Sequence, residues 1–378
     1  MSSQAQMINS ITPTINSTQL KPSHHPMQPF AIAFDIDGVV LRGREPIGGS
    51  PHAFRKLYHH SGSMKIPFLF LTNGGGLPES RRASVLSELL GVNILSSQVL
   101  QGHTLFKNLL GRYQNELIVA TGLGEPALVM REYGFNKVLS LDEYAAYFKD
   151  IDPVAQYKKW TVTSTTNGNN SLKMSTSDFD VYTEKVKAAF VVSDPVDWGR
   201  DIQVLCDILR SGGLPGQENG DQPALYFAAD DLEYQAEFPV KRLGRGAFRI
   251  ALESVFNSIH HTPLVYTTYG KPESIVFENA EATLKELHSS CTMGDDMYAN
   301  ENDSPYFRAL YMIGDNPSVD IKGARQAGHP WISVLTRTGV FRGTGNDAEH
   351  PADLVVDTVE DAVNYILEKE FSASSRSS

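Results

Sequence analysis

The chain contains little cysteine, and this scarcity narrows the class of protein. Cys206 and Cys291 are the only two cysteines among 378 residues. Two thiols cannot form a disulfide framework or a zinc cluster built from cysteines. Such low usage is typical of proteins that work in a reducing compartment.

Long apolar runs and an excess of positive charge are also missing. The longest apolar stretches, such as IPFLFLT at 66–72, fall far short of the roughly 20 residues that a membrane-spanning helix needs. We therefore expect no membrane span. Lys and Arg number 33 against 44 Asp and Glu, giving a net charge of −11. This balance argues against a nucleic-acid partner, so an anionic ligand would have to be attracted locally, by a metal ion and a few cations.

Both ends of the chain lack the pattern of a folded core. Residues 1–29 are rich in Ser, Thr and Pro and contain no Asp, Glu or Arg. They match a mitochondrial transit peptide only in being poor in acids and rich in hydroxyl groups, and a disordered tail is the alternative interpretation. Residues 372–378 are expected to form a second disordered tail.

Between these ends, short apolar runs alternate with helical patterns of 10–15 residues. This alternation is typical of a parallel sheet with helices on both faces, and the length allows two domains. The expected strands of the main sheet are 31–36, 66–71, 117–121, 309–313, 331–335 and 353–357. Further strand-like runs at 188–194 and 224–229, separated by a helical pattern, predict a second α/β unit inserted into the first.

The most informative pattern is Asp35 and Asp37 at the end of the apolar run AIAF. In a strand followed by a turn, both carboxylates can reach the carboxyl end of the strand, where ligands bind in such sheets. One carboxylate can attack a substrate while the other transfers protons. Neighbouring carboxylates repel each other, so the pair calls for a cation, and oxygen ligands favour Mg²⁺. A phosphate ester bound to that ion is the natural electrophile.

Three further motifs follow in order along the chain: LFLTNGGG at 69–76, YGKPES at 269–274 and MIGDNPSVDIKGA at 312–324. Each motif alone has a simpler interpretation. D-x-D-G also occurs in turns and calcium loops, and Thr72 with Asn73 could merely end a strand. Lys271 could be a solvated loop residue, and Asp320 could cap a helix. All four motifs in this order are difficult to explain by chance.

Together the four motifs resemble the signature of the haloacid dehalogenase-like (HAD) superfamily, most of whose members are Mg²⁺-dependent phosphatases. The insertion between the second and third motifs resembles the C2-type cap of subfamily IIA, which contains p-nitrophenyl phosphatases, phosphoglycolate phosphatases and NagD-like enzymes. The blocks DPVDWGRDIQ, RLGRGAFRIALE and TYGKPES resemble the cat-eye-syndrome-critical-region-5 group of eukaryotic HAD hydrolases. The resemblance covers about residues 30–370.

This resemblance implies an α/β, HAD-like fold, in which a parallel Rossmann-like sheet has helices on both faces and carries an inserted α/β cap of the C2 type. We expect the core to comprise residues 30–149 and 244–371, and the cap to comprise 150–243. The polar stretches 158–187 and 290–305 are expected to be surface loops.

The resemblance also implies catalytic roles for five residues. Asp35 matches the nucleophile that forms an aspartyl-phosphate, and Asp37 matches the general acid and base. Thr72 matches the hydroxyl that holds the transferring phosphoryl group, with the amide of Asn73 beside it. Lys271 matches the cation that offsets charge on the nucleophile and the phosphoryl group.

The implied cofactor is Mg²⁺, and its expected ligands are Asp35, Asp37 and Asp315, with Asp37 contributing its backbone carbonyl. Asp320 and Asn316 are expected to lie next to these ligands without binding the metal themselves. Asp320 would hold a metal-bound water or Lys271.

The cap is expected to determine the substrate, and its residues are harder to interpret. Arg242, Arg245 and Asp231 are the candidate substrate contacts. Asp197 and Asp201 belong to a nearby polar cluster, but they can equally stabilise the start of a helix. No set of cap residues identifies the leaving group.

A Mg²⁺-dependent phosphatase of small phosphorylated metabolites is the favoured function, because Asp37 supplies the acid that hydrolysis of an alkyl phosphate needs. A carbon–halide dehalogenase would need neither Asp37 nor Mg²⁺, and a phosphomutase commonly carries a smaller cap. A non-enzymatic binding or scaffold protein is the alternative. Loss of Asp35 or Lys271 would have suggested it, but both are present.

The expected partner is a small phosphorylated substrate, and a homodimer formed through the cap is one assembly compatible with this organisation. The family resemblance implies a mitochondrial location and a link to glycerophospholipid metabolism. Without the resemblance, the cytoplasm is the expected compartment.

Overall fold

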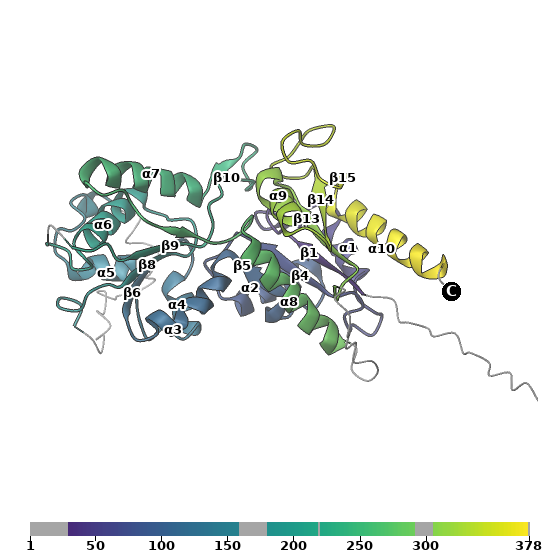
Figure 1. Cartoon of the computed structure of the whole chain (residues 1–378), viewed down its shortest axis with the longest axis horizontal. Helices are drawn as coiled ribbons and strands as arrows, with labels where there is room; N and C mark the ends of the chain where they lie inside the picture. Colours follow the sequence, from purple (N-terminus) through teal and green to yellow (C-terminus); the bar gives the residue numbers. More distant parts are fainter. Residues whose placement is uncertain (1–28, 159–179, 218–219, 292–304, 377–378) are drawn as a thin grey trace, which may run out of the picture.

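The computed structural model describes residues 29–158, 180–217, 220–291 and 305–376. Figure 1 shows two α/β units side by side, joined near the middle of the molecule. Most of the expected tail 1–29 and much of the polar stretches 158–187 and 290–305 lie outside the described residues, so those expectations stay predictions.

The first unit is built on a six-stranded parallel sheet. Its strands are β1 (Phe30–Phe34), β4 (Phe68–Thr72), β5 (Val99–Gln101), β13 (Ala309–Gly314), β14 (Trp331–Thr336) and β15 (Leu354–Val356). They lie in the order β15-β14-β13-β1-β4-β5. The chain therefore builds the sheet outward in one direction from β1, then returns and builds in the other direction from β13. The neighbouring ends of β1 and β13 form the switch point at which such sheets bind ligands.

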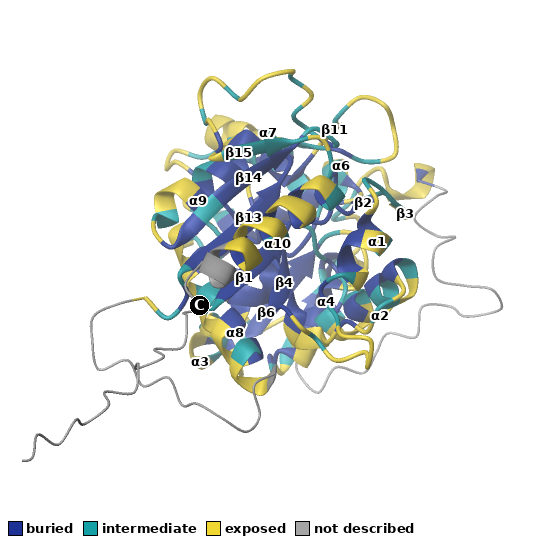
Figure 2. Cartoon of the chain, turned by 90° about the vertical axis from the view of Figure 1, so that its right-hand side faces the viewer, coloured by how far each residue is buried: buried dark blue, intermediate teal, exposed yellow. Residues whose placement is uncertain are grey.

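Helices cover both faces of this sheet. Phe30, Ile32 and Phe34 of β1 share one buried cluster with helices α1 (Ser50–Arg55), α2 (Glu79–Leu90) and α10 (Val359–Arg376). Ala31 and Ala33 face the other side, where α8 (Ser274–Cys291) and α9 (Lys322–Ala327) pack. Figure 2 shows the buried strands between helices whose outer faces are exposed. This layering confirms the parallel sheet covered on both faces.

Helix α10 corrects the expected tail at 372–378, because it continues to Arg376. Side chains near its end anchor it to the sheet. Glu370 is 5% exposed and accepts a hydrogen bond of 2.7 Å from Arg308 Nε. The ring of Phe371 packs edge-on against Phe30 at 6.3 Å. The low hydrophobicity of residues 372–378 gave no sign that the helix continues into them.

The second unit has its own five-stranded parallel sheet. Its strands are β6 (Leu117–Thr121), β7 (Lys137–Ser140), β8 (Ala188–Val191), β9 (Ala224–Phe227) and β12 (Thr267–Thr268), in the order β12-β9-β8-β6-β7. One face packs against α5 (Leu141–Tyr147), α6 (Trp198–Arg210) and α7 (Arg245–Ile259). The other packs against η2 (Gly102–Leu109), α3 (Leu110–Tyr113) and α4 (Pro126–Glu132).

The division of the chain differs from the expected one. The cap was expected at 150–243, but β6 pairs with β7 and β8 and therefore belongs to the second sheet. Phe248, Leu252 and Phe256 of α7 pack in the same unit. The second unit thus begins after β5 and ends with β12. An apolar run predicts a buried strand, but it does not tell which of two sheets that strand joins.

The local sequence explains where α5 begins and where α2 ends. Ser140 Oγ accepts a hydrogen bond from Glu143 N at 3.0 Å, while the Glu143 carboxylate accepts one from Ser140 N at 2.8 Å. This capping box begins α5. Gly91 ends α2 with a φ of 68°, which glycine adopts without strain. Shorter helical segments are η1 (Ser96–Gln98), η3 (Ala155–Tyr157) and η4 (Pro317–Ile321).

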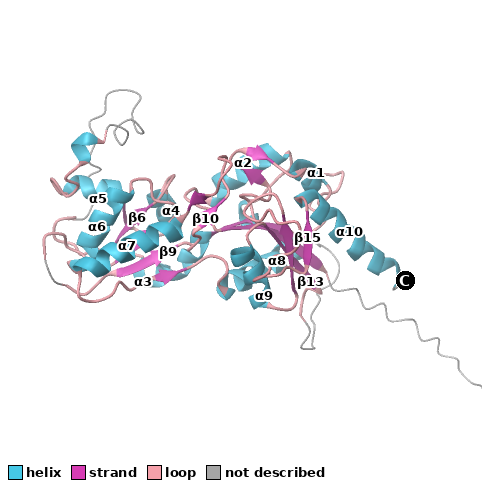
Figure 3. Ribbon diagram, turned by 90° about the horizontal axis from the view of Figure 1, so that it is seen from above, coloured by secondary structure: helices cyan, strands magenta, loops and turns pink. Residues whose placement is uncertain are grey.

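Two small hairpins complete the fold: β2 (Leu41–Arg42) with β3 (Glu45–Pro46), and β10 (Glu233–Tyr234) with β11 (Arg242–Leu243). The β10–β11 hairpin lies between the two units (Figure 3). It contacts the first unit through Arg342, which donates to Gln235 Oε1 at 2.5 Å and to Pro239 O at 3.2 Å. In the described part of the chain, no helix is long and apolar enough to cross a membrane.

Candidate active site

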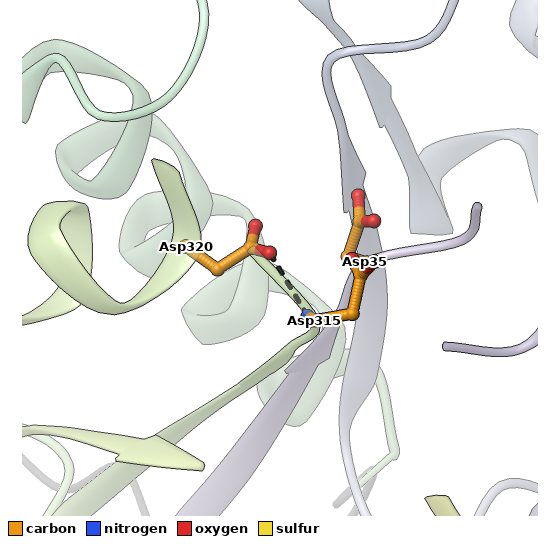
Figure 4. Close-up of side chains that lie close together, drawn as sticks. All are labelled: Asp35, Asp315 and Asp320. Carbon is orange, nitrogen blue, oxygen red and sulfur yellow. Dashed lines mark hydrogen bonds between the residues drawn. The ribbon is translucent and has the colours of Figure 1, made fainter. Parts of the chain in front are cut away.

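Three acidic side chains meet at the switch point of the first sheet. Asp35 follows β1, Asp315 follows the neighbouring strand β13, and Asp320 lies in η4 just beyond. One carboxylate oxygen of each lies within 4.8 Å of the corresponding oxygens of the other two, and all three residues are buried. Figure 4 shows the three side chains converging from these adjoining elements. Residues far apart in the chain are thus gathered at one edge of the sheet.

Lys271 ties this cluster together. Its Nζ donates hydrogen bonds to Asp35 Oδ1 at 2.8 Å and to Asp320 Oδ1 at 2.6 Å, and its side chain is only 1% exposed. The other oxygen of Asp320 accepts from the backbone N–H groups of Asp315 and Asn316 at 3.1 and 3.0 Å. Asp320 therefore holds Lys271 and the loop that carries Asp315, which fits the supporting position expected for it.

Burial and mutual repulsion shift the pKa values in the cluster. Burial raises the pKa of Asp35 to about 7, although the attraction of Lys271 opposes the change. Burial, followed by repulsion from Asp35 and Asp320, raises the pKa of Asp315 well above its ordinary range. Lys271 keeps its proton, because the attraction of Asp320 and Asp35 outweighs burial and raises its pKa. One lysine does not neutralise three carboxylates, so the donor set suits an added divalent cation.

Two glycines pack closely against the carboxylate of Asp315 and leave no space for a side chain of their own. Val340 N donates to Asp315 Oδ2 at 2.6 Å. A Cβ atom at Gly339 would lie 1.8 Å from the same oxygen, and one at Gly38 would lie 2.4 Å from it. The loop after β14 was not among the sequence-based candidates. The available signal was a glycine four residues after the expected strand 331–335, in the run TRTGVF at 336–341.

Asp37 and Thr72 line the space beside the cluster. A Cβ atom at Gly74 would lie 3.2 Å from Asp37 Oδ2 and 3.1 Å from Thr72 Oγ1, so these two oxygens flank the same point. Gly74 N donates to Thr72 Oγ1 at 3.0 Å, which leaves the hydroxyl proton available for another acceptor. Burial raises the pKa of Asp37. Its carboxylate is not part of the three-acid group, and metal ligation through its carbonyl stays a prediction.

The side chain of Asn73 links the backbone of Lys271 to the carboxylate of Asp231. Its side-chain oxygen accepts from Lys271 N at 2.7 Å, and its Nδ2 donates to Lys271 O at 2.9 Å. The same Nδ2 donates to Asp231 Oδ2 of the second unit at 2.8 Å. Burial raises the pKa of Asp231 to about 6, against the attraction of Arg245 and Lys271. The side chain of Asn73 therefore positions Lys271, a role that the motif alone did not reveal.

Two of the three expected cap residues reach the site. Asp231 and Arg245 line a cavity of about 80 Å³ together with the acidic cluster, whereas Arg242 is exposed on β11 and does not line it. The guanidinium of Arg242 instead lies over the Phe238 ring at 4.6 Å. The cavity also exposes side chains that the sequence did not single out as substrate contacts: Asp194, Tyr234 and Gln235.

Comparison with known proteins agrees with this geometry. Family models described as haloacid dehalogenase-like hydrolase and HAD-hydrolase-like match residues 32–136 and 268–362. A mitochondrial hydrolase of Saccharomyces cerevisiae is 33% identical over 353 residues, covering 90% of this chain and 96% of the yeast protein. The chain belongs to the haloacid dehalogenase-like hydrolases. The expected family, its α/β fold and its hydrolase activity are thereby confirmed.

A second relative, from Schizosaccharomyces pombe, is a cardiolipin synthase (CMP-forming) and mitochondrial hydrolase fusion protein. It is 33% identical over 356 residues, and the match covers 92% of this chain and 55% of the fusion protein. The HAD hydrolase thus spans about half the length of that relative.

Solved structures share the fold at low sequence identity. A glycerol phosphate phosphatase of Mycobacterium tuberculosis, in complex with calcium, has a TM-score of 0.54 at 18% identity and covers 87% of this chain and 73% of its own. A p-nitrophenyl phosphatase of Archaeoglobus fulgidus has a TM-score of 0.54 at 16% identity, with coverage of 90% and 100%. These neighbours show that the chain shares their fold, and the grouping with subfamily IIA stays a prediction. The finer grouping with the cat-eye-syndrome-critical-region-5 proteins stays a prediction.

Proposed function

We propose that this HAD hydrolase is a Mg²⁺-dependent phosphatase that hydrolyses small phosphomonoesters through an aspartyl-phosphate on Asp35. The observation that carries the proposal is the position of Lys271 between Asp35 and Asp320, with Asp315 beside them. Binding and scaffold functions have no need to bury three carboxylates and a lysine in one cluster, since such burial is costly. A nucleophilic site that binds a cation and a phosphoryl group does need them.

The proposed metal ligands are the carboxylates of Asp35 and Asp315 and the backbone carbonyl of Asp37. Oxygen donors of this kind suit Mg²⁺. When bound, the ion would offset negative charge on the carboxylates and the phosphoryl oxygens. Related structures solved with magnesium and with calcium support a divalent cation in this fold.

In the first step of the proposed reaction, a carboxylate oxygen of Asp35 attacks phosphorus and the bond from phosphorus to the leaving oxygen breaks. Asp37 gives its proton to that oxygen, so the alcohol departs neutral. The raised pKa of Asp37 favours the protonated form that this step needs. Thr72 Oγ1 donates a hydrogen bond to a phosphoryl oxygen, and Lys271 stabilises the growing negative charge.

In the second step, Asp37 accepts a proton from a water molecule as that water attacks the phosphorus. The acyl phosphate bond to Asp35 breaks, which releases inorganic phosphate and restores the free carboxylate. Asp37 therefore gives the proton to the leaving oxygen and takes one from water, and Asp35 is regenerated after each turnover.

Hydrolysis of p-nitrophenyl phosphate tests the proposal. Treatment with EDTA should abolish activity and added Mg²⁺ should restore it, and Asp35→Asn should lower turnover by several orders of magnitude while circular dichroism stays unchanged. Asp150→Asn, at a side chain that is 81% exposed, is the matched control and should be fully active. Full activity after exhaustive chelation would contradict the mechanism. A wild type that hydrolyses no phosphate ester but still binds Mg²⁺ and a protein would favour the scaffold alternative.

The compartment and the metabolic setting are part of the same proposal. Both yeast relatives are named mitochondrial hydrolases, which supports a mitochondrial location. The fusion to a cardiolipin synthase in one of them supports a link to glycerophospholipid metabolism. Fractionation of cells that express the tagged chain tests the location. A homodimer formed through the cap stays a prediction, which light scattering of the purified protein would check.

A further inference from the structure

The loop after β4, residues 73–76, is hydrogen-bonded through its backbone to the second unit. Three of its carbonyl oxygens accept hydrogen bonds from that unit: Asn73 O from Arg245 Nη2, Gly74 O from Gly102 N at 3.4 Å, and Gly76 O from Glu125 N at 2.7 Å. Thr72, the proposed hydroxyl donor to the phosphoryl group, stands directly before this loop. The second unit therefore contacts the first unit at a part of the active site.

Glycines allow the two backbones to approach closely at the end of this loop. Gly76 has a φ of 97°, and a Cβ atom there would lie 2.0 Å from Leu123 O of the second unit. A Cβ atom at Gly124 would lie 2.4 Å from Gly76 O. Neither position has room for a side chain, so backbone packs directly against backbone. The shape of the loop therefore depends on the second unit.

Arg245 makes the side-chain contact between the second unit and this loop. It is 3% exposed. Its Nη1 donates to Val192 O, just after β8, at 3.1 Å, and its Nη2 donates to Asn73 O, just after β4. The charge is balanced by Asp194, whose Oδ1 lies 3.8 Å from Nε. One planar guanidinium thus bridges the carboxyl ends of strands that belong to different sheets, which the fixed fork of arginine donors suits.

Asn73 connects this contact to the catalytic lysine. While Arg245 holds the carbonyl of Asn73, the side chain of Asn73 accepts from Lys271 N at 2.7 Å and donates to Lys271 O at 2.9 Å. Lys271 Nζ in turn donates to Asp35 Oδ1 at 2.8 Å. A displacement of Asn73 would therefore displace the backbone that carries Lys271 beside the proposed nucleophile.

We infer that Arg245 is a positioning residue for phosphoryl transfer: it holds Asn73, and Asn73 holds Lys271 against Asp35. This inference rests on the proposed phosphatase function. Misplacement of a reacting group by about 1 Å can lower a rate by about 10²-fold. Loss of Arg245 should therefore slow each intact active site. A purely stabilising role would instead reduce the number of folded molecules and leave the turnover of each one unchanged.

Arg245→Met tests this difference, because methionine is apolar and cannot donate to either carbonyl. Hydrolysis of p-nitrophenyl phosphate is measured at saturating substrate and Mg²⁺, and the rate is divided by the number of Mg²⁺ sites that calorimetry counts in the same sample. We expect kcat per intact site to fall by about 10–100-fold. Amide hydrogen exchange in EDTA, without substrate, should become faster at Lys271, whose N–H is bonded to Asn73.

Ser211→Ala is the matched control for the loss of a buried bond to a backbone carbonyl. Ser211 is 1% exposed, lies just after α6 and donates to Ile208 O at 3.2 Å within the second unit. Arg242→Met controls for the loss of an arginine, since Arg242 is exposed and lies outside the cavity. Both variants should keep the wild-type kcat per intact site and the wild-type exchange at Lys271.

A wild-type kcat per intact site in Arg245→Met, or unchanged exchange at Lys271, would overturn the positioning role and leave the phosphatase proposal intact. If Arg245→Met does not fold, Asp231→Ala decides by exchange alone, because it removes the second-unit acceptor that lies 2.8 Å from Asn73 Nδ2. Exchange at Lys271 must then become faster, and unchanged exchange would refute the inference. A wild type that hydrolyses no phosphate ester would overturn both proposals.

Discussion

Burial raises the pKa of Asp35 from 3.8 to about 7, and this shift predicts that the metal-free protein becomes less stable as the pH rises. The folded state holds the proton of Asp35 more tightly than the unfolded state does. The contribution of Asp35 to the free energy of unfolding is therefore fully present below about pH 4, and it is lost as the pH rises through about 7. Asp315, whose pKa is also raised, acts in the same direction.

The size of the effect follows from the shift. At pH 5 the unfolded chain has already released most of the proton from Asp35, whereas the folded protein still holds it. Between pH 5 and pH 8, Asp35 alone should therefore reduce the free energy of unfolding by about 2–3 kcal/mol. This reduction is a substantial part of the stability of an ordinary domain.

Urea unfolding in EDTA, followed by circular dichroism at several pH values, measures this loss. Asp35→Asn removes the ionisable group and keeps the shape, so the variant should be more stable than the metal-free wild type at pH 8 and should depend less on pH. Added Mg²⁺ should oppose the loss in the wild type, because the metal binds the ionised carboxylates. A free energy of unfolding that stays constant or increases between pH 5 and pH 8 in EDTA would refute this account of the cluster.

Two further predictions concern the proton donor and the metal site. Asp37→Asn should reduce kcat for alkyl phosphates by about 10²–10⁴-fold but affect p-nitrophenyl phosphate much less, because nitrophenolate leaves without a proton; equal losses on both substrates would remove Asp37 from this role. Gly339→Ala should weaken Mg²⁺ binding in calorimetry by about tenfold or more, since its Cβ would displace the Asp315 carboxylate. Gly345→Ala is the control, because a Cβ at this position meets no atom within 4 Å. An unchanged affinity of Gly339→Ala for Mg²⁺ would exclude Asp315 as a ligand.

The sequence by itself determined where the main strands of the first sheet lie and which acidic residues follow them. Apolar runs of a few residues marked β1, β4, β13 and β14 to within about two residues, because strand burial is a local property of the chain. The motif carboxylates stand directly after two of these strands. Carboxyl ends of parallel strands meet at one edge of a sheet, so their meeting in space could be foreseen.

Only the tertiary structure decided which sheet each strand joins and which cap side chains reach the site. The pairing of β6 with β8, and the place of α7 in the second unit, depend on contacts between residues far apart in the chain, which periodicity does not encode. Arg242 and Arg245 stand three residues apart and look alike in the sequence. One lies on an exposed strand and the other begins a buried helix, and so only Arg245 lines the cavity. The direction of a side chain is set by the backbone that carries it, and the backbone is placed by packing across the whole molecule.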